Sequence, residues 1–133
     1  MSYHVVDPAD LDSTPEYPCD RRSIAEEAEL STLAASVYEM APGEEFAQEY
    51  HYHDQREELF YVLAGTLVVE TPEREYEVQS GSVFVVTPDS PIRPYNPDNA
   101  DHSVRVLGVG APQHDIGRPY DGTAGDQRGD RES

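Results

Sequence analysis

Two histidines, His51 and His53, are the residues of this chain whose type and spacing best suit chemistry. They alternate with Tyr50 and Tyr52, and side chains along a β-strand point alternately to its two faces, so a strand here would place both imidazoles on one face. Neutral imidazoles are ligands for transition metals. Because the spacing alone also fits two half-exposed histidines beside a turn, a third ligand has to be found.

A carboxylate follows the turn at residues 54–56, where Glu57 and Glu58 open an apolar segment. If Glu58 faces inward with Phe60 and Val62, Glu57 faces outward. The outward stripe would then continue through Leu59, Tyr61 and Leu63. Two imidazoles and one carboxylate form a mixed nitrogen and oxygen ligand set, which suits Fe, Mn, Ni, Cu or Zn.

The elements that must position these side chains are short strands. Turn residues separate apolar or alternating segments at 33–40, 46–53, 59–63, 66–70, 74–78, 83–86, 92–96 and 103–109. About eight short strands with turn signals every 8–12 residues are typical of an all-β sandwich or small barrel. No predicted helix is long enough to cover a sheet; residues 24–30 fit one or two helical turns.

The 133 residues suit one domain of ordinary size. Residues 1–30 are predicted to be an N-terminal arm interrupted by prolines, and residues 31–112 the barrel. Residues 113–133 form a polar tail rich in glycine, which we expect to be partly disordered. The single cysteine, Cys19, cannot form an internal disulfide and is interpreted as a bystander thiol.

Residues 42–65 carry a Pro-Gly turn, a His-x-His pair, a glutamate and a glycine in a fixed order. These residues are Pro42, Gly43, His51, His53, Glu58 and Gly65. The order resembles the first conserved motif of the cupin superfamily, although the gap from Gly43 to His51 is two residues longer than usual. Residues 81–96 are similar to the second motif, through Gly81, Pro88 and Asn96. The resemblance covers roughly residues 33–111. It implies a cupin double-stranded β-helix, or jelly-roll barrel, here with an extended N-terminal arm.

The resemblance also implies a third histidine ligand in the second motif, where this chain has Arg93. A guanidinium stays protonated and cannot ligate a metal. Two interpretations remain open. In the first, His51, His53 and Glu58 bind one divalent metal and Arg93 contacts an anionic or sugar-like ligand. In the second, the site is metal-free and Arg93 pairs with Glu58 or with the ligand.

Tyr95 lies two residues from Arg93 and would share its face of a strand, so it is a second candidate for substrate binding; the alternative is a packed strand aromatic. Weaker candidates are His102 as a metal ligand and Arg105 and Gln48 as pocket residues. The residues expected outside the site are His4, His114, Tyr50, Tyr52 and Tyr61.

The charge balance is strongly acidic. Nine basic residues, all arginine, face 27 acidic ones, which gives a net charge of −18. This excess argues against nucleic acid and anionic membranes as partners. It resembles the composition of proteins from salt-in halophilic archaea; an acidic mesophilic protein is the alternative. No apolar run approaches the length of a membrane span, and no export signal is visible, so a cytoplasmic location is expected.

The sequence therefore predicts a small-molecule-binding protein with a mononuclear metal site, and it leaves open whether the protein is an enzyme. Any catalysis would be oxygenation, isomerisation or lyase chemistry at the metal. A metal-free anion-binding module is the alternative, and a structural partner protein with a vestigial pocket is a third. By analogy with small cupins we expect a homodimer, formed through a sheet face or by exchange of N-terminal strands.

Overall fold

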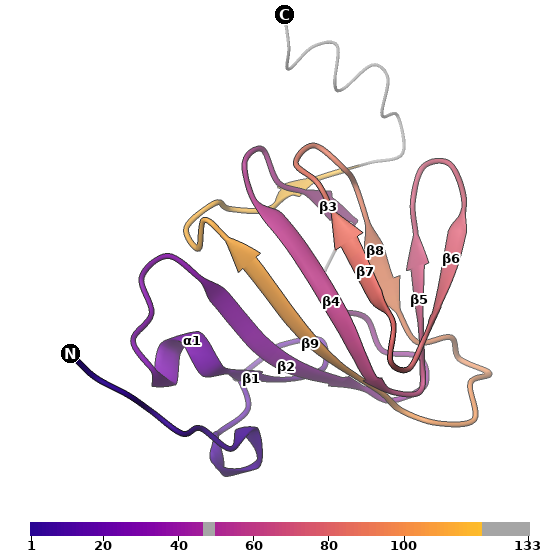
Figure 1. The fold of residues 1–133 in the computed structure, drawn as a ribbon. Helices are drawn as coiled ribbons and strands as arrows, with labels where there is room; N and C mark the ends of the chain where they lie inside the picture. The colour runs from indigo at the N-terminus through magenta and orange to yellow at the C-terminus, as the bar shows by residue number, and fades with distance from the viewer. Residues whose placement is uncertain (47–49, 121–133) are drawn as a thin grey trace, which may run out of the picture.

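The computed structural model describes residues 1–46 and 50–120. Two antiparallel sheets face each other (Figure 1). The larger sheet runs in the order β1 (Asp20–Ser23), β2 (Ala34–Met40), β9 (Val104–Ala111), β4 (Glu57–Ala64) and β7 (Val83–Val86). The smaller runs in the order β6 (Glu75–Gln79), β5 (Thr66–Glu70) and β8 (Arg93–Tyr95), and β3 (His51–Tyr52) pairs with β10 (Arg118–Pro119). This is the all-β jelly-roll arrangement that the sequence predicts.

The alternation predicted for β4 is confirmed. Phe60 and Val62 are buried, whereas Leu59, Tyr61 and Leu63 are each about 40% exposed. Successive side chains of a strand point to opposite sides of the sheet, so Glu58 points to the same side as Phe60 and Val62, toward the interior. The core lies between the two sheets. Its fully buried side chains include Met40, Val62, Leu67, Val69, Val104 and Val106. Burial of a side chain of this size contributes about 1.5–3 kcal/mol to stability.

Two residues of the cupin-like motifs have clear structural roles. Gly65 joins β4 to β5 with a φ of +80°, and a Cβ there would lie 2.6 Å from the Ser103 carbonyl oxygen, so only glycine fits. Asn96 is buried, and its Nδ2 donates to the carbonyl oxygens of Met40 at 3.1 Å and His102 at 2.9 Å. The second motif thereby fixes the end of β2 beside the turn before β9.

The predicted N-terminal arm contributes two elements that the sequence did not predict, the edge strand β1 and the 3-10 turn η1 (Pro8–Asp10). It also contains the short helix α1 (Ile24–Glu27), where one or two helical turns were predicted. The Ser23 hydroxyl accepts a hydrogen bond from the Glu26 amide and caps α1. Cys19 is buried in the core, and burial raises the pKa of its thiol to about 12, so the thiol is unreactive at neutral pH.

The first part of the predicted C-terminal tail is ordered, because residues 112–120 pack across one end of the barrel and include β10. We call residues 112–120 the C-terminal strap. Residues 121–133 and the pocket candidate Gln48 lie outside the described residues. No helix among the described residues is long and apolar enough to cross a membrane.

Candidate metal centre

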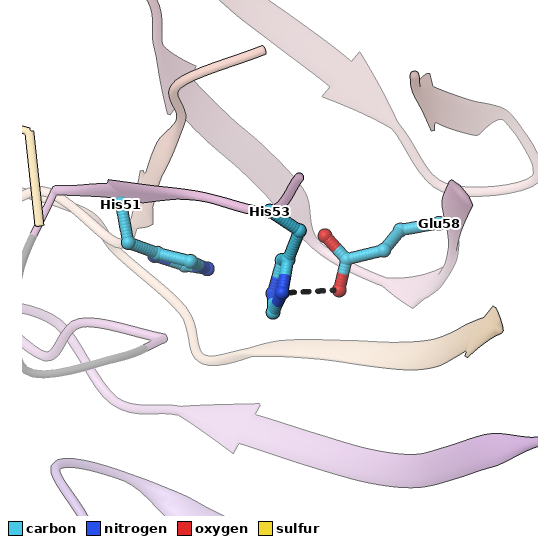
Figure 2. Close-up of side chains that lie close together, drawn as sticks. All are labelled: His51, His53 and Glu58. Carbon is cyan, nitrogen blue, oxygen red and sulfur yellow. Dashed lines mark ion pairs between the residues drawn. The ribbon is translucent and has the colours of Figure 1, made fainter. Parts of the chain in front are cut away.

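The structure brings the three predicted ligands together. His51 lies on β3, His53 follows that strand directly, and Glu58 projects toward them from β4 (Figure 2). One ligand atom from each of the three side chains lies within 4.8 Å of the other two. The Nε2 atom of His53 is 3.9 Å from Oε2 of Glu58, and the two imidazole rings meet edge to face with centroids 5.4 Å apart. The atoms therefore surround a space of the size that one metal ion occupies.

Backbone contacts with the segment before β8 hold the two histidines in place. His51 pairs with Ile92 in an isolated bridge, and the His53 carbonyl oxygen accepts from the Asp89 amide at 2.7 Å. The tight turn between the histidines and Glu58 is closed from the strap. The Asp115 carboxylate accepts from the amides of Gln55 at 2.5 Å and Arg56 at 2.7 Å.

The C-terminal strap covers the histidines. Its backbone passes so close that a Cβ on Gly117 would lie 3.2 Å from Cδ2 of His51 and 3.6 Å from Cε1 of His53. Arg118 fastens the strap to Asp54 through a contact of 2.5 Å. A polar tail would not be expected at a buried site from sequence alone, and it is one of the features that the sequence interpretation missed.

Burial dominates the electrostatics of the site. It lowers the pKa of His53 to about 4, with smaller effects from Arg56 and His51, so the imidazole is neutral at neutral pH. It raises the pKa of Glu58 to about 7, although Arg56 opposes this shift. A neutral imidazole has the lone pair that a metal needs, and a buried carboxylate gains stability from a nearby cation.

These properties fit a divalent transition metal. His51, His53 and Glu58 supply nitrogen and oxygen donors, and three protein ligands leave coordination positions for water or substrate. The Nδ1 atom of His53 is also buried and has no hydrogen-bond partner in the described part of the chain. A metal bound to Nδ1 would satisfy this atom. A rotation of the His51 or His53 ring that gives Nδ1 a hydrogen-bond partner would do the same.

The structure corrects the prediction for Arg93 and Tyr95. The residue between them, Pro94, faces the core, so both side chains project from the opposite, outer face of β8. Arg93 donates from Nε to Glu70 at 2.7 Å and from Nη1 to Glu45 at 2.9 Å, and its guanidinium carbon lies 4.1 Å from the Tyr95 ring centroid. Arg93 therefore does not pair with Glu58, because the parity assigned to this short strand was offset by one residue.

Two other residues stand where Arg93 was expected. Ile92 is the residue that faces the interior beside His51. The guanidinium near Glu58 belongs to Arg56, whose Nη1 lies 3.7 Å from Oε2 of that carboxylate. Arg56 is held by the strap, because its Nε donates to the Pro112 carbonyl oxygen at 3.1 Å and its Nη2 donates to the Gln113 carbonyl oxygen. The sequence signal that could have identified Arg56 is its position two residues before Glu58.

The weaker candidates lie elsewhere. His102 is on an exposed turn, and Arg105 is on the outer face of β9, where it pairs with Glu39 at 3.4 Å. His4 and His114 are exposed, as predicted. The tyrosines differ from one another: Tyr61 is partly exposed, Tyr50 packs on Tyr120 of the strap with ring centroids 4.7 Å apart, and Tyr52 is buried.

Solved structures with a similar fold come from several bacteria. The polyketide cyclase RemF from Streptomyces resistomycificus has 19% identity and a TM-score of 0.75, with 90% of this chain and 87% of that chain covered. A sugar phosphate isomerase from Silicibacter pomeroyi, assigned to the cupin superfamily, has 20% identity, a TM-score of 0.68 and coverage of 81% and 75%. A predicted oxalate decarboxylase from Thermotoga maritima has 14% identity, a TM-score of 0.69 and coverage of 82% and 99%. At these identities the similarity shows the fold alone.

The sequence itself gives the family. No curated protein matches this chain. The profile of the Cupin domain family matches residues 36–109, a stretch that runs from β2 to β9 and contains all three candidate ligands. The chain therefore belongs to the cupin family.

Proposed function

We propose that this protein is a metal-dependent cupin in which His51, His53 and Glu58 hold one divalent transition metal and leave coordination positions for a small polar ligand. The convergence of three ligand atoms within 4.8 Å, at the interior end of the barrel, is the observation that carries the proposal. The neutral state of His53 supports it, since a protonated imidazole could not bind a metal.

A bound metal would supply Lewis-acid or redox chemistry at its open positions. Oxygenation, isomerisation and lyase reactions are the classes we propose, with Fe, Mn, Ni, Cu or Zn as the metal. The cyclase, the isomerase and the predicted decarboxylase among the similar structures support a catalytic role in general, but they favour none of these classes over the others.

Metal analysis tests this proposal. Protein purified in high salt without a chelator should carry nearly one transition metal per chain, measured by elemental analysis, and His51→Ala should abolish it. His114→Ala is the matched control, because His114 is exposed on the strap, so that variant should keep its metal. Native protein that is metal-free and takes up no metal on titration would contradict the proposal.

A metal-free anion-binding module is the second candidate, and the Arg56–Glu58 pair favours it. A guanidinium beside a buried carboxylate neutralises that carboxylate without a metal. In this case metal content would be near zero, and a bound anion would replace Glu58 as the partner of Arg56. Anion binding would then survive His51→Ala, and Arg56→Gln would abolish it. The two candidates therefore differ in which single substitution removes the bound group.

We also propose a homodimer in a salt-rich cytoplasm, with no nucleic acid or membrane partner. The apolar stripe predicted on β4 is wider than expected, because Val83 and Val85 of β7 lie beside it and are 49% and 66% exposed. An apolar face of this kind on a chain of charge −18 favours a protein partner over solvent. The net charge of −18 supports a salt-rich environment and argues against nucleic acid and anionic membranes as partners.

A further inference from the structure

A cavity of about 330 Å³ is lined by inward-facing residues of β2, β9 and β4 together with residues of the N-terminal segment. Its volume falls in the range of pockets that hold small organic molecules. The Glu58 carboxylate forms part of its wall, so a molecule in the cavity would lie beside a metal ligand.

Small residues let the side chains that line this cavity lie close against the sheet. Along β9 the inward positions change from Val104 and Val106, which fill the core, to Gly108 and Gly110. A Cβ on Gly108 would lie 3.0 Å from Cε1 of Tyr38, and a Cβ on Gly110 would lie 2.9 Å from Cδ of Arg56. Larger residues at either position would therefore displace the walls of the cavity.

The neighbouring strand repeats this change. On β2 the inward positions run from Met40 and Tyr38 to Ser36 and Ala34, and the last two lie across from Gly108 and Gly110. Both strands therefore lose side-chain volume at the same end of the barrel. The opening at this end of the interior lies beside Glu58.

The walls combine aromatic surface with two cations. The rings of Tyr38 and Phe60 flank Gly108, and burial raises the pKa of the Tyr38 hydroxyl, which is therefore neutral. Arg56 lies beside Glu58, and Arg21 of β1 stands directly across from Tyr38 in the register. Both arginines line the cavity, and Nη1 of Arg21 also donates to the Thr14 hydroxyl at 2.8 Å.

The charge of the cavity depends on the metal site. Among its acidic residues, Glu26 and Glu29 are exposed at the rim and are screened by solvent, and Glu26 lies 3.6 Å from Arg21. Glu58 is buried, but as a metal ligand its charge is balanced by the metal. Arg21 and Arg56 then give the loaded cavity an excess of positive charge in a partly desolvated place, which favours an anion.

We infer that this cavity is the substrate chamber of the metal site and that it takes a small organic carboxylate with a planar apolar body. The inference rests on the proposed function, because a metal must balance the charge of Glu58 before the positive charge of Arg21 and Arg56 exceeds the negative charge in the cavity. Arg21 is then a substrate-binding residue contributed by the N-terminal segment, in the role that the sequence assigned to Arg93.

Zinc-loaded protein and two probes test the inference by titration calorimetry. Benzoate carries the carboxylate and a planar ring, and benzamide is its neutral counterpart of the same shape. Wild type should bind benzoate at least about tenfold more tightly than benzamide. Arg21→Gln should reduce benzoate affinity about tenfold with zinc content unchanged, and Arg21→Lys should keep part of the affinity. Arg105→Gln removes the same charge on the outer face of β9, and this control should behave as wild type.

A second variant covers the case in which Arg21→Gln disturbs the N-terminal segment. Ala34→Leu fills the cavity from β2 and replaces none of the three metal ligands, so it should lose benzoate binding and retain zinc. Equal binding of benzoate and benzamide, or full benzoate affinity in both variants, would overturn the inference while leaving the metal site intact. Wild-type protein that takes up no zinc would overturn the proposed function, and the inference with it.

Discussion

Ile92 lies directly across from His51 and exchanges two backbone hydrogen bonds with it, with N–O distances of 3.1 and 2.8 Å. Residues opposed in this way direct their side chains to the same face, and Ile92 is 2% exposed. The position next to His51 on the interior face is therefore occupied by an aliphatic side chain. This explains why the three candidate ligands come from β3, the residue after it and β4, and none comes from the segment before β8.

Ile92→His should add a fourth ligand. The new imidazole would point toward the same space as His51, so we expect metal affinity to rise about tenfold or more, measured by competition with a coloured chelator. Arg93→His is the matched control, because position 93 faces outward between Glu45 and Glu70. A larger gain in Arg93→His than in Ile92→His would show that the strand parity assigned here is wrong.

The part of the site on β4 could be predicted because that strand is long and strictly alternating. Phe60 and Val62 fix its inward face, and Glu58 shares their parity. The spacing of His51 and His53 likewise predicts a shared face, but it needed Glu58 and the cupin-like motif to indicate a ligand set. Strands with a regular pattern thus determine which side chains share a face without knowledge of the rest of the fold.

The second half of the site could not be predicted in this way. β8 has three residues and contains Pro94, so no alternation is long enough to fix its parity, and an error of one residue moved Arg93 from the outer face to the interior. The edge strand β1 and the strap have no apolar periodicity either. Their positions depend on contacts far along the chain, such as Asp115 with the amides of residues 55 and 56.

Gly117 should be necessary for metal binding. Any side chain there would enter the space next to His51 and His53, where a Cβ would already lie 3.2 and 3.6 Å from ring carbons. We expect Gly117→Val to displace the strap or the imidazoles and to lower zinc affinity about tenfold, measured by calorimetry. The control is Ile116→Ala, since Ile116 is 81% exposed. Full zinc affinity in folded Gly117→Val would show that the strap does not constrain the ligands.

Glu58 should destabilise the metal-free protein at alkaline pH. Its pKa in the folded state is about 7, against an ordinary value of 4.5, so between these values the folded state holds a proton that the unfolded state has lost. Stability therefore falls as the pH rises through this window, and the cost is complete above about pH 7. We expect Glu58→Gln to raise the stability of metal-free protein by about 2 kcal/mol near pH 8, and to have little effect near pH 4.5.

Thermal melts with and without zinc check whether Glu58 destabilises the metal-free protein and stabilises the zinc-bound protein. Zinc should stabilise wild type and leave Glu58→Gln unchanged, because the variant has lost a ligand. Glu57→Gln removes the same charge from the exposed face of β4 and should match wild type at both pH values. If Glu58→Gln were less stable than wild type near pH 8, the ion pair with Arg56 would outweigh the cost of burying the carboxylate.

The apolar face of β4 and β7 should mediate the dimer. Val85 is 66% exposed and lies across from Leu59, so a charge at position 85 would face solvent in a monomer and a partner in a dimer. We expect Val85→Glu to convert the dimer to a monomer in light-scattering measurements, with the thermal midpoint of the monomer little changed. Ile116→Glu, on the strap and not on β4 or β7, should remain dimeric. A wild-type monomer, or a dimeric Val85→Glu, would contradict the assignment.

Stability should also increase with salt. At a net charge of −18 the carboxylates repel one another, and this repulsion extends over about 10 Å in 0.1 M salt but only about 3 Å in 1 M salt. We expect the midpoint of thermal unfolding to rise by about 10 °C between 0.1 and 2 M KCl, followed by circular dichroism. Sucrose at equal osmolality favours compact states without screening charge, so it should give a smaller rise. A rise that ends by about 0.3 M KCl would favour the acidic mesophilic protein, because screening of surface charges is then nearly complete, whereas a rise that continues into the molar range would favour the halophile.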